Sequence, residues 1–163
     1  MVTIREARKE DVDEILSWNE NTEDFLTQWS NFTYPLTKEQ YLERIDSDAI
    51  IVFAIEQDGC LAGTIQIFRM NKGAKSAIIG CFLINPSLRG AGIGEEALKL
   101  TAQYAFEKLG LSKVILNVFD FNKGAIRCYE KAGFYKVSEY VHNNGWKGYQ
   151  MVCDRKGGES DKH

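Results

Sequence analysis

Three alternating glycines, Gly90, Gly92 and Gly94, lie in the middle of the chain between two apolar segments. Glycine weakens the interior of a helix or strand, so such a cluster indicates a turn with unusual backbone angles or a close approach to a ligand. The preceding segment, 76–86, is nearly all apolar, as expected of a central strand buried on both faces. The segment after the glycines repeats apolar residues at helical spacing as far as Leu109.

The remaining segments predict a mixed α/β sheet. Alternating or continuous apolar residues predict further strands at 2–7, 50–56, 60–70, 113–120, 135–141 and 146–153. Helical patterns occupy 11–21, 37–45 and 122–134. The order is strand, two helices, three strands, helix, strand, helix and two strands, which indicates α/β architecture with helices on both faces. We expect one domain over 1–154 and a disordered polar tail at 155–163.

The composition narrows the choice of partners and compartment. The formal net charge is −3 and no basic run occurs, so we expect no nucleic-acid partner. The N-terminus is too polar for a signal peptide and no stretch is long and apolar enough for a membrane span, so we expect a cytoplasmic protein without a membrane partner. The chain has only two histidines, so the sequence argues against a metal centre and against a serine–histidine catalytic triad.

The cysteines have neither the spacing of zinc ligands nor that of a disulfide framework. We therefore expect no metal, and reduced, mostly buried thiols. The four residues are Cys60, Cys81, Cys128 and Cys153.

The turn at 89–94 has the chemistry of a phosphate site. A helix N-terminus offers unpaired N–H groups and a partial positive charge, small residues allow close approach, and Arg89 adds a cation. A dinucleotide fingerprint would need glycine where Glu95 stands, and a Walker loop would need lysine directly after Gly94. A plain connection without a ligand is the alternative, although it rarely needs three glycines and an arginine.

Two segments together resemble the GCN5-related N-acetyltransferase (GNAT) family. The turn matches the pattern [Q/R]xxGx[G/A], and VFDFNKGAIRCYEKAGF at 118–134 is similar to VxxxNxxAxxxYxxxGF. The resemblance covers roughly 50–153 and is weaker before it. It implies the GNAT fold: a mixed, mostly antiparallel central sheet of about seven strands, with helices on both faces. It also implies that the strands at 78–84 and 113–119 splay apart.

The resemblance implies acetyl-CoA as the acetyl donor, entering between the splayed strands. The backbone of Phe82, Leu83 and Ile84 would pair with the pantetheine amides, a form of strand addition. The diphosphate would bind the turn, which consists of Arg89, Gly90, Ala91, Gly92, Ile93 and Gly94. The thioester arm would pass the residues of the second motif, Asn122, Ala125 and Tyr129.

The residues of the second motif also have simpler interpretations. Asn122 and Tyr129 are seven positions apart and therefore face the same way on a helix to within about 20°. Taken alone, Asn122 could serve only as an N-cap, and a tyrosine such as Tyr129 would more often be a core aromatic; the resemblance favours a cofactor contact for both. Cys128 lies about 100° around the helix from Tyr129, so we expect a buried thiol rather than an acyl carrier. His142 falls in a turn, and we expect it in solvent.

The implied reaction is direct transfer of the acetyl group to a primary amine, with Tyr129 as the general acid and backbone N–H groups near Leu83 as donors to the carbonyl. A phenol with a pKa near 10 gives its proton to a thiolate of pKa about 8.5 only at a cost of about 2 kcal/mol. A hydrogen bond to the developing thiolate therefore suffices. No carboxylate lies in 76–84, where many relatives carry a glutamate, so the base candidates are Glu20, Glu23 and Glu139.

The acceptor is the least constrained part. At pH 7, deprotonation costs roughly 4.6 kcal/mol for a lysine amine and about 1.1 kcal/mol for an α-amine, which favours a protein or peptide α-amine. The segment 3–21 also resembles the branch of the family that acetylates the N-termini of ribosomal proteins. Acidic and aromatic residues at 18–32 suit a cationic amine, although a solvated helix face with core aromatics explains them equally well.

Two other functions stay open. One is acetylation of a small amine such as a polyamine or an aminoglycoside. The other is a non-catalytic acyl-CoA-binding module, against which the intact Asn122 and Tyr129 argue. The exposed strands expected at 135–153 allow a homodimer.

Overall fold

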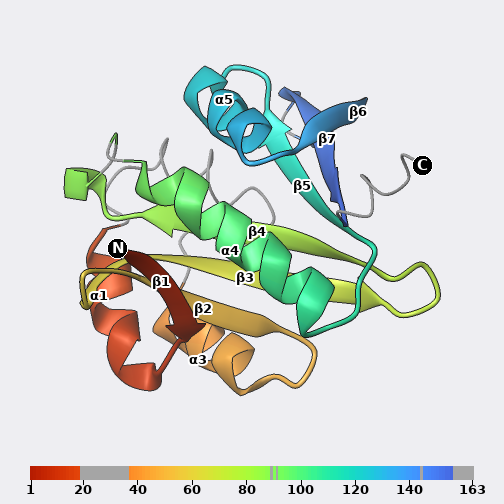
Figure 1. Ribbon diagram of the computed structural model, residues 1–163. Helices are drawn as coiled ribbons and strands as arrows, with labels where there is room; N and C mark the ends of the chain where they lie inside the picture. Colours follow the sequence, from red (N-terminus) through yellow and green to blue (C-terminus); the bar gives the residue numbers. More distant parts are fainter. Residues whose placement is uncertain (19–36, 89, 91, 144, 156–163) are drawn as a thin grey trace.

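The computed structural model describes residues 1–18, 37–88, 90, 92–143 and 145–155. In this part of the chain seven strands form one sheet in the order β1-β2-β3-β4-β5-β7-β6 (Figure 1). Only β4 and β5 pair in parallel; the other neighbours are antiparallel. The predicted mixed, mostly antiparallel sheet is confirmed. The strands are β1 Val2–Glu6, β2 Ile51–Gln57, β3 Cys60–Asn71, β4 Ser76–Ile84, β5 Lys113–Phe119, β6 Tyr135–Val141 and β7 Lys147–Asp154.

Helices cover both faces of the sheet, as the sequence predicts. On β3, Ile67 packs in the core beneath α4, whereas its neighbour Phe68 packs with α1 and α3. Successive strand residues point to opposite faces, so α4 lies on one face and the pair α1 and α3 on the other. The helices are α1 Val12–Ser17, α3 Lys38–Asp46, α4 Ile93–Glu107 and α5 Lys123–Lys131. Short 3₁₀ turns at Lys9–Asp11 and Pro86–Leu88 precede α1 and the glycine turn.

The two central strands separate after a short pairing. Ser76–Ile78 of β4 pairs with Lys113–Ile115 of β5, and no pairing follows, although β4 continues to Ile84 and β5 to Phe119. The hydrogen-bonding edge of β4 that faces β5 is therefore open beyond Ile78. The predicted splay of the central strands is confirmed.

A bulge in β4 decides which side chains face the gap. Thr64 of β3 lies opposite Leu83, but Gln66 lies opposite Gly80, so one extra residue is inserted in β4. Cys81 sits in this bulge with a φ of 51°. Because the bulge inverts the alternation of side chains, Phe82 joins the core beneath α4 and Leu83 joins the opposite core.

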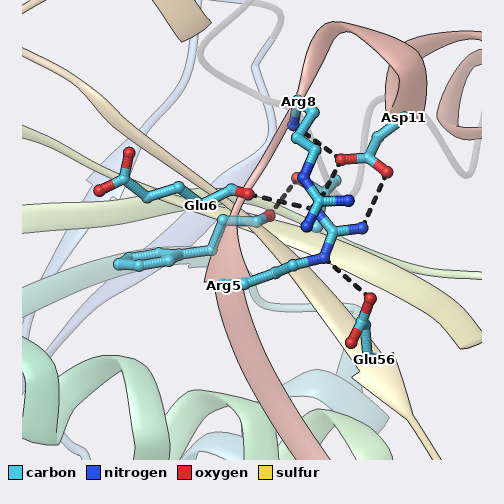
Figure 2. Close-up of polar contacts among 7 residues, drawn as sticks. Arg5, Glu6, Arg8, Asp11 and Glu56 are labelled. Atoms are coloured by element: carbon cyan, nitrogen blue, oxygen red, sulfur yellow. Dashed lines mark hydrogen bonds and ion pairs between the residues drawn. The ribbon is translucent and has the colours of Figure 1, made fainter. Parts of the chain in front are cut away.

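The N-terminal strand is held by a network of charged groups (Figure 2). The Arg5 guanidinium donates two hydrogen bonds to the Asp11 carboxylate, both at 2.9 Å, and a third to Glu56 at 2.8 Å. The backbone N–H of Arg8 donates to the same Asp11 carboxylate at 2.7 Å. The network therefore connects β1 to β2 and to the turn that begins α1.

Asp11 is 8% exposed, and its environment acts on the pKa of its carboxyl group in two directions. Burial favours the neutral acid, but the hydrogen bonds from Arg5 and from the Arg8 N–H outweigh it and lower the pKa of Asp11. A lowered pKa stabilises the folded state above the unfolded pKa, and this contribution is lost as the pH falls through the folded value.

We expect Asp11→Asn to lower the free energy of unfolding at pH 7 by about 1–3 kcal/mol, because Arg5 loses one of its two carboxylate partners. Urea unfolding measures the loss, and the difference from the native protein should shrink as the pH falls below about 3.9. Asp13→Asn is the matched control, since Asp13 is 77% exposed and its ion pair with Lys38 is a surface pair. Equal losses in both variants, or a difference independent of pH, would contradict this role.

Candidate functional site

A cavity of about 660 Å³ lies between β4, the N-terminus of α4 and α5. It brings together nine of the site residues predicted from the sequence: Phe82, Ile84, Gly90, Gly92, Ile93, Gly94, Asn122, Ala125 and Tyr129. The side chain of Leu83 is buried on the opposite face of the sheet, so only its backbone can face the gap. Arg89 and Ala91 lie outside the described residues.

The glycine turn shapes one end of the cavity. Gly90 and Gly92 adopt left-handed backbone angles, with φ of 87° and 80°. Gly94 does not, and a methyl group there would lie in ordinary contact, 3.5 Å from the Phe82 ring and 3.6 Å from the Cys128 sulfur. Gly94 is therefore not required by the fold, but it leaves the cavity open at this point.

The helix that follows the turn begins without a side-chain cap. Gly92 is the N-cap of α4, and no side chain accepts a hydrogen bond from its first turn in the described chain. By contrast, Thr37 caps α3 and Asn122 caps α5. The first N–H groups of α4 can therefore donate hydrogen bonds to a bound ligand. Three residues of this first turn, Ile93, Gly94 and Glu95, line the cavity.

The N-cap interpretation of Asn122 is confirmed. Its Oδ1 accepts a hydrogen bond from the N–H of Ala125 at 3.2 Å, which fixes the start of α5. Both residues also line the cavity. The short Ala125 side chain leaves space on the face of α5 between Asn122 and Tyr129.

Tyr129 lines the cavity beside the aromatic ring of Phe82. Tyr129 is 7% exposed, and its ring stacks on Phe82, with centroids 6.2 Å apart and planes at 25°, and also contacts Phe134. Burial raises the pKa of Tyr129 well above that of an ordinary phenol, so the hydroxyl keeps its proton at neutral pH. Its side chain makes no hydrogen bond to another described residue, which leaves the O–H available as a donor.

Cys128 borders the cavity beside Tyr129 rather than lying in the core. It is half-buried, and burial raises its pKa to about 11. The thiol is therefore protonated at neutral pH and is a poor nucleophile. Among the four cysteines, Cys81 is buried, Cys60 is exposed, and Cys128 and Cys153 are partly buried. The expectation that most of the thiols are buried is therefore wrong.

Two further residues differ from expectation. His142 is half-buried, with its ring centroid 5.6 Å from that of Phe119 and the two planes at 79°, so the solvated position expected of it is wrong. Glu139 is exposed on β6, 3.7 Å from Lys147, and is not among the residues that line the cavity. Glu20, Glu23 and most of the acidic and aromatic segment 18–32 lie outside the described residues.

Several lining residues are missed by reasoning from the sequence. Gly124, Arg127, Cys128 and Lys131 line the cavity at positions i, i+3, i+4 and i+7 of α5. This is the spacing of one helix face, so the pattern is visible once the helix has been predicted. Leu88, Glu95 and Phe121 complete the lining, and no periodic pattern marks them.

For the acetyl transfer that the family resemblance implies, we expect Cys128→Ala to keep kcat within about twofold of the native value, because a protonated thiol takes no covalent part in that reaction. Steady-state rates of thiol release with both substrates varied provide the measurement. Intersecting double-reciprocal lines are expected, whereas parallel lines together with an inactive Cys128→Ala variant would show a covalent acyl carrier.

No helix in the described ranges is both long enough and apolar enough to cross a membrane.

Comparison with known proteins gives a consistent result. Residues 12–134 match the model of the acetyltransferase (GNAT) family. The probable N-acetyltransferase YjcK of Bacillus subtilis is 32% identical over 168 residues, which cover 93% of this chain and 92% of that protein. The spermidine N(1)-acetyltransferase of Escherichia coli K12 is 34% identical over 90 residues, which cover 55% of this chain and 48% of that protein.

The solved structures show the same fold. The crystal structure of spermidine N-acetyltransferase from Vibrio cholerae, in complex with CoA and spermine, superposes with a TM-score of 0.82 at 22% sequence identity. The match covers 95% of this chain and 96% of that one.

Proposed function

The chain belongs to the GNAT family and is an acetyl-CoA-dependent N-acetyltransferase, and we propose that its preferred acceptor is a small cationic amine of the polyamine class. We further propose that the cavity beneath α4 and α5 binds the donor, with Tyr129 beside the reacting thioester. The observation that carries this proposal is the early end of the β4–β5 pairing over a cavity that holds a buried, protonated tyrosine.

The two polar parts of the cavity fit the two polar parts of the donor. The uncapped first turn of α4 offers N–H groups that can bind an anion. Arg89, four positions before the helix in the sequence, adds a positive charge. These groups would hold the diphosphate. The open edge of β4 over Ile79–Ile84 offers backbone groups to an extended chain of amides, and this edge would hold the pantetheine arm.

Acetyl-CoA supplies an acetyl group activated as a thioester. The Tyr129 hydroxyl holds its proton at Oη and would donate a hydrogen bond to the sulfur as negative charge develops there. Burial raises the pKa of Tyr129, so complete proton transfer is less favourable than from an ordinary phenol. We therefore propose a hydrogen-bonding role for Tyr129. The amine nitrogen forms its bond to the acetyl carbon as the bond from that carbon to sulfur breaks, and solvent takes the proton that the amine loses and delivers one to the released thiolate. Backbone N–H groups near Leu83, just past the bulge, would polarise the acetyl carbonyl.

Similarity to spermidine acetyltransferases supports a small amine as the acceptor. Phe121 lines the cavity and is 46% exposed, and its ring centroid lies 5.1 Å from that of Trp146 and 5.5 Å from that of Phe119. Such an aromatic surface suits an alkyl ammonium group. A protein or peptide α-amine, the acceptor predicted from the sequence, is the second candidate. The observation that favours it is that β4 contains no carboxylate that could act as a base.

The acceptor is tested with spermidine, spermine, a monoamine of similar length and a set of short peptides with free N-termini. We expect turnover with the polyamines at a kcat/KM at least about tenfold above that of any peptide, a difference of about 1.4 kcal/mol in transition-state binding. Release of free thiol is the measurement. Turnover with peptides alone would reverse the order of the candidates, and binding of CoA without any turnover would identify a non-catalytic module.

Removing the Tyr129 hydroxyl tests the proposed chemistry. We expect Tyr129→Phe to lower kcat about 100-fold, because the developing thiolate loses its donor. The dissociation constant of CoA should stay within about threefold, since most of the donor would be bound elsewhere in the cavity. Tyr135→Phe is the matched control: its hydroxyl donates to Asp154 on the outer strands, so kcat should not change.

The pH dependence provides a second measurement on the same variant. A raised pKa means that Tyr129 loses its proton only above the ordinary phenol value, so the native enzyme should show no decline in kcat from this group below pH about 10. The profiles of the native enzyme and Tyr129→Phe should therefore differ in height and not in shape. An alkaline limb below pH about 10 that disappears in Tyr129→Phe would show that the pKa of Tyr129 is not raised, and would contradict the role of a hydroxyl that keeps its proton.

A further inference from the structure

We propose that Arg127 and Lys131 form a second anion site in the cavity, and that this site binds the 3′-phosphate of coenzyme A. The inference rests on the proposed binding of acetyl-CoA in the cavity. Coenzyme A carries two separate anionic groups, the diphosphate and the 3′-phosphate on its ribose. The glycine turn accounts for only one of them.

Both cations line the cavity, on the side of α5 that also carries Gly124 and Cys128 and about 160° around the helix from Tyr129. Arg127 and Lys131 are four positions apart, so their Cβ atoms lie about 5–6 Å from each other along the helix. The small residues Gly124 and Cys128 share this face. No atom lies within 4 Å of the position that a Cβ of Gly124 would occupy, so the space beside the cations is open.

Neither cation is neutralised by a carboxylate in the described part of the chain. Two like charges at i and i+4 repel each other on a helix, and a bound anion would remove that repulsion. The carboxylate that lines the cavity, that of Glu95, pairs with Lys99 at 3.0 Å on its own helix. The charge presented from α5 is therefore positive.

At Arg127 and Lys131 themselves, the positive charge fits an anionic group of the donor and not the ammonium of the acceptor. An amine acceptor arrives mostly as a cation at neutral pH and would be repelled by Arg127 and Lys131. The site also lies on a different helix from the uncapped N–H groups of α4. Two separate positive regions in one cavity match a ligand with two separate anionic groups.

The experiment compares CoA with 3′-dephospho-CoA, which keeps the diphosphate and lacks only the 3′-phosphate. Isothermal titration calorimetry gives the dissociation constants for the native protein, for both single variants and for Arg127→Gln/Lys131→Gln. We expect the native protein to bind CoA about tenfold more tightly than 3′-dephospho-CoA, from two partly exposed charge pairs. The double variant should bind both ligands equally, with the affinity of the native protein for 3′-dephospho-CoA. Higher salt should reduce the native preference.

Lys123→Gln is the matched control, because Lys123 is exposed on the same helix and does not line the cavity. This variant should keep the full preference for CoA. Equal native affinities for the two ligands, or a preference that survives in the double variant, would overturn the inference and leave the proposed function standing. If the double variant bound CoA and 3′-dephospho-CoA more weakly by the same factor, the two cations would bind the diphosphate instead, and the inference would also be wrong. Failure of the native protein to bind CoA at all would instead refute the proposed function.

Discussion

The short parallel pairing of β4 with β5 is the constraint on which the site depends. Three residues of each strand pair, and then the backbone of β4 loses its partner on that side. The sheet tolerates this loss because β3 and β7 pair with the two strands along their outer edges. The core beneath α4 holds their apolar side chains in place. The cavity is thus built from unmade backbone hydrogen bonds, which a ligand rich in amides can complete.

Much of the fold could be predicted from the sequence, because apolar periodicity alone marks the strands and helices. The splay could not, because 76–84 and 113–119 are both apolar enough for full pairing, and only the family resemblance implied it. The bulge at Cys81 was also hidden. Ile79 packs beneath α4 before the bulge and Phe82 does so after it, whereas strict alternation would point Phe82 into the opposite core. Register of this kind depends on pairing across strands, which no local pattern records.

The chemistry of the cavity was less predictable than its lining, because burial is decided by neighbouring elements and not by a residue's own segment. Burial raises the pKa of both Tyr129 and Cys128, so the two groups stay neutral and covalent catalysis by the thiol is disfavoured. Arg127 and Lys131, about 160° around α5 from Tyr129, are exposed. Neutral groups on one side of the helix and cations on another suit a donor that carries both a thioester and phosphates.

The uncapped start of α4 has a consequence for the whole protein. A helix of fifteen residues that packs on the central sheet begins with N–H groups that no side chain satisfies in the described chain. An anion that completes this first turn binds the folded state and not the unfolded one, so it stabilises the fold by mass action. The lifetime of the enzyme in the cell would then follow the supply of its own acetyl donor.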